Sequence, residues 1–154
     1  MKTEVSLPTL ERTQTFARLL AAELAPGDAV LLCGDLGVGK TTIVEQIARS
    51  VGYEGDVSSP TFTLAHHYEG VEPSLLHVDA YRLSGTAEFV DMGLDFHGPD
   101  VATLIEWGDR VASLFSDALV VSIRFGEGDV REATIESTSA RWDAFGLKLG
   151  ELNR

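Results

Sequence analysis

A glycine-rich stretch in the first third of the chain carries the residues whose spacing most clearly indicates chemistry. Its sequence, Gly34-Asp35-Leu36-Gly37-Val38-Gly39-Lys40-Thr41, follows the pattern G-x-x-x-x-G-K-T of a phosphate-binding loop. Glycines let the backbone wrap closely around a polyphosphate, while successive N–H groups and a helix N-terminus direct partial positive charge at it. The apolar run at residues 29–32 and the helical pattern at 42–48 predict the strand before the loop and the helix after it. The stretch therefore predicts a polyphosphate site.

Two side chains of this loop have roles that follow from the motif. Lys40 would neutralise the β- and γ-phosphates, and the Thr41 hydroxyl would be a ligand of Mg²⁺. Lys40 is also the only lysine between Lys2 and Lys148. A glycine-rich turn that carries a lysine by chance is the alternative interpretation, and the predicted strand and helix on either side argue against it.

Two later apolar runs end in carboxylates. The run at residues 75–78 leads into Asp79, and the run at 101–105 leads into Glu106. A phosphate-loop NTPase uses an aspartate at such a strand end to hold Mg²⁺ or its water, although many strands end in aspartate. Ligands of open α/β sheets bind at the carboxyl ends of the strands, where both residues would lie. A different role for Glu106, as a cap of a helix at 109–115, remains open at this point.

The hydrophobic periodicity predicts strands that alternate with helices. Strands are expected at 3–7, 29–32, 75–78, 101–105, 119–125 and 131–137, with strand character also at 61–64. Helices are expected at 10–24 with Thr9 as N-cap, and at 41–51, 84–92, 109–115 and 141–149. A turn at 126–129 joins the last two strands into a hairpin. We therefore predict one α/β domain over residues 1–154, a three-layer sandwich like that of P-loop NTPases, with a mainly parallel sheet, an antiparallel edge hairpin and helices on both faces.

Composition limits the partners. The 154 residues include 24 Asp and Glu against 12 Lys and Arg, a net charge of −12. Such a chain repels phosphate backbones, so we expect no direct nucleic-acid binding, and any action on RNA would go through a partner. Cys33, the only cysteine, is expected to be a small buried apolar side chain. No apolar run is long enough for a membrane span and no signal sequence is evident, so a reduced, cytoplasmic setting is expected.

Taken together, the motifs resemble those of TsaE, a family of small bacterial ATPases that works in making threonylcarbamoyladenosine in tRNA. The resemblance covers about residues 7–137. It rests on the phosphate loop, followed in order by S-P-T-F-T-L at 59–64, H-V-D-A-Y-R-L at 77–83, M-G-L at 92–94 and I-E-W at 105–107. The phosphate loop is common to many families, whereas the later strings are far more specific.

The resemblance implies a ligand and a partner. ATP with Mg²⁺ would be bound and hydrolysed while the chain is docked on the TsaB–TsaD heterodimer, which transfers the threonylcarbamoyl group. Hydrolysis would reset that complex for further turnovers. The chemistry of the residues adds an expectation of its own. Lys40 and Mg²⁺ neutralise charge, but a fast NTPase usually adds an arginine at the transferring group, so we expect the isolated chain to hydrolyse ATP slowly and the partner complex to raise the rate.

The resemblance also implies roles for individual residues. Lys40, Thr41 and Thr42 would hold phosphates and metal. Asp79 would support the metal, Glu106 would reach Mg²⁺ or the attacking water, and Trp107 would help to shape that corner of the site. Thr61 would lie in a loop that senses the γ-phosphate, and Arg131 would lie near the base.

Two positions depart from the family pattern. Gly108 stands where a proline is usual, which suggests a looser start of the next helix, and His66-His67 replace less polar residues and are assigned no role.

Two alternative functions, and the role of one residue, stay open at this point. A small-molecule kinase shares the opening strand, loop and helix, but residues 85–100 contain none of the basic residues of a kinase lid. A GTP-dependent regulatory switch would need an N/T-K-x-D string after a late strand, and no lysine is present there. Arg82 is either the arginine that stabilises charge at the transferring phosphate or part of a structural ion pair.

Overall fold

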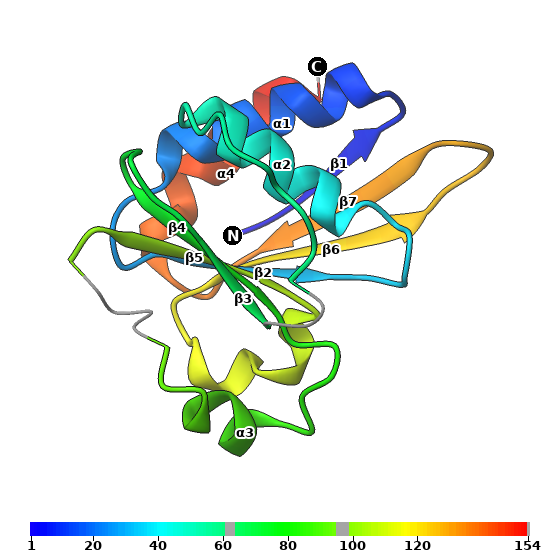
Figure 1. Ribbon diagram of the computed structural model, residues 1–154. Coiled ribbons are helices and arrows are strands. Elements are labelled where there is room, and N and C mark those ends of the chain that lie inside the picture. Colours follow the sequence, from blue (N-terminus) through cyan, green and yellow to red (C-terminus); the bar gives the residue numbers. More distant parts are fainter. Residues whose placement is uncertain (61–63, 95–98, 154) are drawn as a thin grey trace.

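A seven-stranded mixed sheet forms the middle of the computed structural model, which describes residues 1–60, 64–94 and 99–153 (Figure 1). The strands are β1 (Lys2–Leu7), β2 (Ala29–Cys33), β3 (Ala65–Tyr68), β4 (Ser74–Asp79), β5 (Val101–Glu106), β6 (Leu119–Phe125) and β7 (Arg131–Glu136). The helices are α1 (Leu10–Glu23), α2 (Lys40–Ser50), α3 (Thr86–Asp91) and α4 (Asp143–Leu152), with short 3₁₀ turns η1 (Gly108–Arg110), η2 (Ala112–Leu114) and η3 (Ala140–Trp142).

The spatial order of the strands is β1-β7-β6-β2-β5-β4-β3. The four central strands β6, β2, β5 and β4 run parallel, and the β6–β7 hairpin with β1 makes one edge antiparallel. The predicted mainly parallel sheet with an antiparallel hairpin is thus confirmed. The opposite edge is antiparallel as well, because β3 pairs with β4 in that sense, and this strand was not predicted as such. Of the stretch 61–64, residues 61–63 lie outside the described residues, and Leu64 is a bend before β3.

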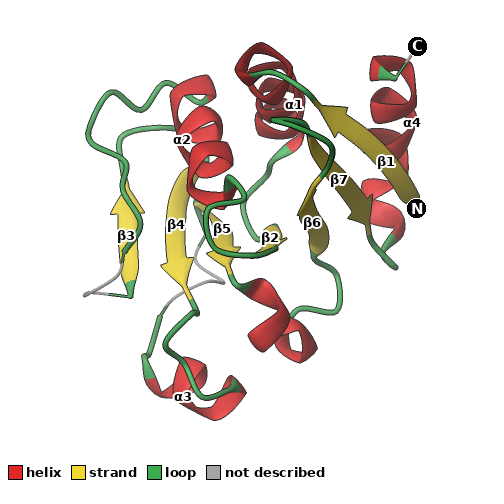
Figure 2. Ribbon diagram, turned by 90° about the vertical axis from the view of Figure 1, so that its right-hand side faces the viewer, coloured by secondary structure: helices red, strands yellow, loops and turns green. Residues whose placement is uncertain are grey.

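Helices cover both faces of the sheet, as predicted. Helices α1, α2 and α4 lie on one face, and α3 with the turns η1 and η2 lies on the other (Figures 1 and 2). Strand β2 explains this arrangement, since Val30 and Leu32 belong to the core under α1 and α2 while Leu31 belongs to the core of the opposite face. Both sets are buried, as expected of a parallel strand between two helical layers.

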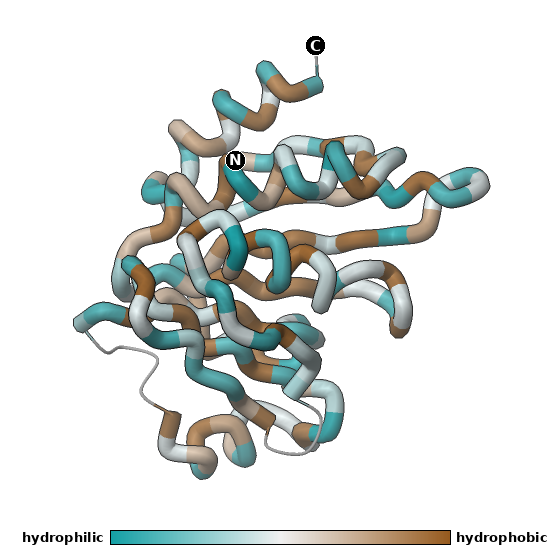
Figure 3. Tube along the Cα trace, turned by 45° about the horizontal axis from the view of Figure 1, so that its top comes forward, coloured by the Kyte–Doolittle hydropathy of each residue, from teal (hydrophilic) through white to brown (hydrophobic). Residues whose placement is uncertain are grey.

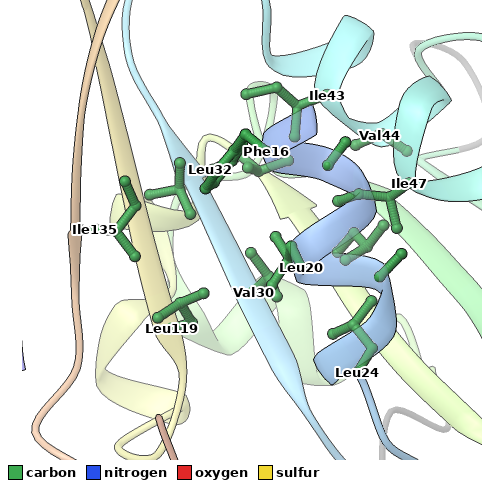
Figure 4. Packing of buried hydrophobic residues seen from close by; sticks show 14 of the residues in the cluster. Phe16, Leu20, Leu24, Val30, Leu32, Ile43, Val44, Ile47, Leu119 and Ile135 are labelled. Atoms are coloured by element: carbon green, nitrogen blue, oxygen red, sulfur yellow. The ribbon is translucent and has the colours of Figure 1, made fainter. Parts of the chain in front are cut away.

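The larger core packs α1 and α2 against the central strands. Figure 4 shows Phe16 and Leu20 of α1 between Ile43 and Ile47 of α2 on one side and Leu32 of β2 on the other. All five side chains are almost completely buried, and a residue of this size contributes about 1.5–3 kcal/mol when it leaves water. This packing fixes the direction of α2, whose first turn borders the phosphate loop.

Hydropathy follows the layers. In Figure 3 the tube is largely hydrophobic along the central strands and alternates along the helices that cover them. Over the described ranges, no helix combines the length and the apolar character that crossing a membrane requires.

The prediction of a helix at 109–115 is wrong. In its place are the two 3₁₀ turns η1 and η2. Trp107 has a left-handed backbone with φ 57°, and Gly108 is packed so tightly on β2 that an added Cβ would lie 2.5 Å from Leu31 Cβ. The chain is therefore bent sharply onto β2 before a regular helix can form, and the junction at Gly108 is tight where a looser one was expected. Of the other predicted helices, α3 is shorter than 84–92, and α4 begins at Asp143 and continues to Leu152.

Candidate nucleotide site

The phosphate loop leaves β2 and enters α2 through glycines with left-handed backbones. Gly37 has φ 79° and Gly39 has φ 114°, conformations that side chains rarely tolerate. At Gly34 the requirement for glycine is steric, because a Cβ there would lie 2.4 Å from the carbonyl oxygen of Ile123 in β6. The loop is closed by the Val38 N–H, which donates to the carbonyl of Asp35 at 3.1 Å. Helix α2 then starts at Lys40.

A pocket of about 420 Å³ lies beside this loop, at the carboxyl ends of β4 and β5. Its walls come from the loop, from the segment before β3 and from the ends of those two strands. They are formed by Leu36, Gly37, Gly39, Lys40, Thr41, Thr42, Ser59, Leu64, Asp79, Tyr81, Arg82, Glu106 and Trp107. The structure therefore brings together most of the residues predicted from the sequence.

Lys40 is the buried cation of this pocket. Only 5% of the residue is exposed, and its Nζ donates to the carbonyl of Gly34 and, at 2.9 Å, to that of Asp35. Nζ also lies 4.2 Å from the centre of the Trp107 ring, within range of a cation–π interaction. Burial lowers the pKa of Lys40, while the negative charges of Glu106 and Asp79 oppose that shift. In this pocket the ammonium is thus poorly hydrated, and an anion can gain strongly from binding near it.

The two carboxylates stand side by side on paired strands. Asp79 and Glu106 are directly opposite each other in the β4–β5 register, and 7% and 4% of these residues are exposed. Thr41 Oγ1 donates to Glu106 Oε1 at 2.7 Å. Glu106 does not cap a following helix, since η1 begins without a side-chain cap. Asp79 accepts from Ser59 Oγ at 3.0 Å and from the Tyr81 N–H at 2.9 Å.

Glu106 has a further partner that the sequence analysis missed. His77, which is fully buried in β4, places its Nε2 2.6 Å from Glu106 Oε2, and its Nδ1 lies 2.8 Å from the hydroxyl of Tyr68 in β3. A signal was available in the sequence, because His77 is the one polar residue inside the apolar run at 75–78. A buried polar side chain needs hydrogen-bond partners, and in a strand His77 must share a face with Asp79.

A second pocket of about 330 Å³ lies on the other side of the phosphate loop, against α1 and the β6–β7 hairpin. Arg131 lines it together with Val38, and Arg131 Nε donates to the Val38 carbonyl at 3.2 Å. The guanidinium also lies 4.4 Å from the centre of the Phe125 ring. Thr42 and Gly39 border both pockets, so the loop separates two adjoining spaces.

The remaining described residues that the sequence singled out are not buried in these pockets. Asp35 and Leu36 are exposed, Leu36 to 79%, and Arg82 is an exposed part of the first pocket's lining. Thr61 lies outside the described residues. His67 is exposed on β3, as expected of a surface histidine.

His66 is half-buried, and its ring lies edge-on to that of His77, with 6.4 Å between the ring centres. Cys33 is half-buried where a fully buried side chain was expected, and desolvation raises the pKa of its thiol to about 11.

The chemistry of these groups fits a magnesium nucleotide. The hydroxyl of Thr41 and the carboxylates of Asp79 and Glu106 are hard oxygen ligands, the type that Mg²⁺ prefers. Across the part of the chain that the structure describes, no three or more His, Cys, Asp and Glu side chains are grouped so that they could hold a metal ion by themselves. Mg²⁺ usually takes one or two carboxylates and shares the remaining positions with phosphates and water.

Comparison with known proteins places the chain in a family. The family model described as Threonylcarbamoyl adenosine biosynthesis protein TsaE matches residues 7–134. The chain belongs to the TsaE family. The TsaE protein of Streptomyces coelicolor is 42% identical over 133 residues, 81% of this chain and 90% of that protein. The TsaE protein of Bacillus subtilis is 40% identical over 137 residues, 86% of this chain and 84% of that protein.

A solved structure agrees with this assignment. The crystal structure of Bacillus subtilis YdiB superposes with a TM-score of 0.80 and 30% identity, covering 100% of this chain and 97% of that one. The TsaE resemblance expected from the motifs is thus confirmed, and with it a role in threonylcarbamoyladenosine biosynthesis. Three of the four more specific strings meet at the first pocket, to which they contribute Ser59, Asp79 and Glu106.

Proposed function

We propose that this TsaE-family chain binds ATP with Mg²⁺ and hydrolyses it in support of tRNA threonylcarbamoyladenosine formation, acting on the TsaB–TsaD complex. One observation carries the proposal: Lys40, Thr41, Asp79 and Glu106 line a single pocket at the N-terminus of α2. A helix N-terminus preceded by a glycine loop favours phosphate, and the carboxylates opposite favour a divalent cation.

Each side chain has a role in this proposal. The loop N–H groups and Lys40 bind the phosphates, and Lys40 exchanges its contacts with Gly34 and Asp35 for phosphate oxygens. Thr41, Asp79 and Glu106 would hold Mg²⁺, which when bound neutralises charge on the phosphate oxygens. Thr41 can keep its hydrogen bond to Glu106 while its oxygen faces the metal, since a hydroxyl both donates and accepts.

The second pocket suits the nucleoside part. Thr42 joins the two pockets, so a nucleotide whose phosphates lie against Lys40 would place its base toward Arg131. The guanidinium of Arg131 is already oriented by the Val38 carbonyl and the Phe125 ring. A planar cation of this kind can stack on or donate to an adenine ring.

The rim of the first pocket fits a partner that covers it. Leu36 is 79% exposed and Tyr81 is 49% exposed, and both border the pocket. Large apolar side chains exposed beside a site are typical of interaction surfaces. Docking of TsaB–TsaD over this rim would exclude water and order the site, which agrees with a slow isolated ATPase that the partner accelerates.

ATP turnover by the purified chain tests the proposal, with and without TsaB–TsaD and with a chelator of Mg²⁺. We expect slow turnover alone, faster turnover with the partner and none with chelator. Lys40→Ala should lower kcat/KM by about 10²–10³, the usual loss when one group that stabilises transition-state charge is removed. Lys148→Ala is the matched control, because Lys148 pairs with Glu23 on the surface and should leave turnover unchanged. Wild-type levels of turnover in Lys40→Ala would contradict the proposed site.

A further inference from the structure

A buried chain of hydrogen bonds reaches Glu106 through two residues that do not line the first pocket. It runs from Tyr68 in β3 through His77 in β4 to Glu106 in β5, with Tyr68 Oη 2.8 Å from His77 Nδ1 and His77 Nε2 2.6 Å from Glu106 Oε2. At most 4% of any of the three residues is exposed. The contacts proposed for nucleotide and metal include neither Tyr68 nor His77.

The donors in this chain can be assigned from its two ends. Burial raises the pKa of Tyr68 to about 12, so at neutral pH its hydroxyl keeps the proton. At the other end, the carboxylate oxygen Oε2 of Glu106 can only accept, so His77 Nε2 is the donor there and the Tyr68 proton points at His77 Nδ1. Nδ1 is then the acceptor, so the ring proton sits on Nε2 and is donated to the Glu106 carboxylate.

The effect on Glu106 is geometric. One carboxylate oxygen, Oε2, is bound to His77, and the other, Oε1, accepts from Thr41 in the first turn of α2. A carboxylate held at both oxygens cannot rotate about its last bond without losing a buried hydrogen bond, which costs about 1–3 kcal/mol. Glu106 is therefore presented to the pocket in one orientation.

We propose that His77, held in its Nε2–H form by Tyr68, is a positioning residue that fixes the Glu106 carboxylate for the reaction at the nucleotide site. The inference rests on the proposed ATPase function and adds to it two residues that touch neither nucleotide nor metal.

Two substitutions of His77 separate positioning from packing. In His77→Gln the side-chain amide reaches the position of Nε2 and can still donate to Glu106, whereas in His77→Asn the shorter amide lies near the position of Nδ1 and faces Tyr68. We expect kcat to fall by about 10–100-fold in His77→Asn, as for other residues that orient a ligand group, and by less than about tenfold in His77→Gln. The KM for ATP should change less than about twofold in both. His67→Gln, on the exposed histidine of β3, should match wild type.

A measurement without nucleotide tests the geometry by itself. In the ¹⁵N-labelled full chain, the ring nitrogens of His77 should show a protonated Nε2 and an unprotonated Nδ1, and Tyr68→Phe should shift both signals without unfolding the chain. Thermal unfolding of each variant shows whether it folds. If a variant at position 77 fails to fold, Tyr68→Phe provides the kinetic test, with a smaller loss of kcat at unchanged KM.

The outcomes distinguish this inference from the proposed function. A proton on Nδ1, or equal kcat in wild type, His77→Asn and Tyr68→Phe, overturns the role of His77 and leaves the ATPase proposal standing. A loss that appears as raised KM in place of lowered kcat also overturns it. Absence of ATP turnover in the wild type, alone and with TsaB–TsaD, overturns both.

Discussion

Glu106 and Asp79 face each other across two paired parallel strands, yet different parts of the molecule hold them. Glu106 bonds to Thr41 of α2 and His77 of β4, so its partners belong to regular elements. Asp79 accepts from Ser59 Oγ and from the Tyr81 N–H, which belong to the segments before β3 and after β4. One carboxylate is fixed by the core, whereas the orientation of the other depends on loops.

This difference suggests separate duties for the two groups. A carboxylate fixed at both oxygens is suited to orient a water or a metal, because no reorganisation is needed during the reaction. A carboxylate held by the hydroxyl of Ser59 depends instead on contacts made outside the sheet. The backbone N–H of Asp79 also donates to the carbonyl of Leu64, at 2.9 Å, which ties the same strand end to the segment that follows Thr61. Asp79 is thus the carboxylate whose contacts lie with the segments before β3 and after β4.

The largest expected effect tests the fixed carboxylate. Glu106→Gln keeps the size of the side chain but replaces one oxygen by an amide that cannot accept a hydrogen bond. We expect kcat to fall by about 10²–10³ while the affinity for ATP changes little, since the lost interaction matters mainly in the transition state. ATP binding by calorimetry and turnover under the same conditions separate the two quantities. Glu69→Gln, an exposed position, is the control, and equal losses of binding and turnover would make Glu106 a binding residue only.

A smaller effect with a different signature is expected at Asp79. Asp79→Asn should lower kcat by about 10–100-fold, and the Mg²⁺ concentration for half-maximal turnover should rise by a similar factor, because a charged metal ligand is lost. The rate is measured as a function of Mg²⁺ at saturating ATP, with Asp91→Asn on the surface as control. If Asp79→Asn and Glu106→Gln gave the same profile, the distinction between a core-held and a loop-held carboxylate would be lost.

Stability offers the next test, because the strand end that carries Glu106 is packed onto β2. Gly108→Ala should destabilise the fold by about 1–3 kcal/mol, the usual cost of overpacking, since its Cβ would lie 2.5 Å from Leu31 Cβ and 2.9 Å from Leu31 Cα. Urea unfolding measures the change. In Gly150→Ala, where an added Cβ meets nothing within 4 Å, helix propensity predicts a gain of up to about 1 kcal/mol. Equal stability of the two variants would show that the turn after Glu106 is not held by β2.

Much of this site could be predicted from the sequence, because its main signals are local. The phosphate loop combines strand, glycines, lysine and helix within a few residues, and each carboxylate follows its own apolar run. Parallel strands bring their carboxyl ends to one edge, so Asp79 and Glu106 could be expected near Lys40 without knowing the register.

Contacts between distant segments could not be predicted in the same way. The bond between His77 and Glu106 depends on the pairing of β4 with β5, and η1 replaces a helix because Gly108 meets Leu31. Strand β3 is only four residues long, and its sequence Ala-His-His-Tyr lacks a clear alternation of apolar and polar residues. Tyr68 was therefore not assigned to a strand, and its contact with His77 could not be seen.

The smallest effect is expected where neither carboxylate is involved, at the contact between α1 and α4. Lys148 Nζ lies 2.8 Å from Glu23 Oε2, and this hydrogen bond is the main cause that lowers the pKa of Glu23. Because the pKa is lower in the folded chain, the stabilisation is present above the unfolded value near 4.5 and is lost as the pH falls through the folded value. Lys148→Ala should therefore cost about 0.2–1 kcal/mol at pH 7 and progressively less below pH 4, as measured by urea unfolding across this range. A loss that stayed constant down to pH 2 would mean that Lys148 stabilises the fold through packing of its aliphatic stem and not through Glu23.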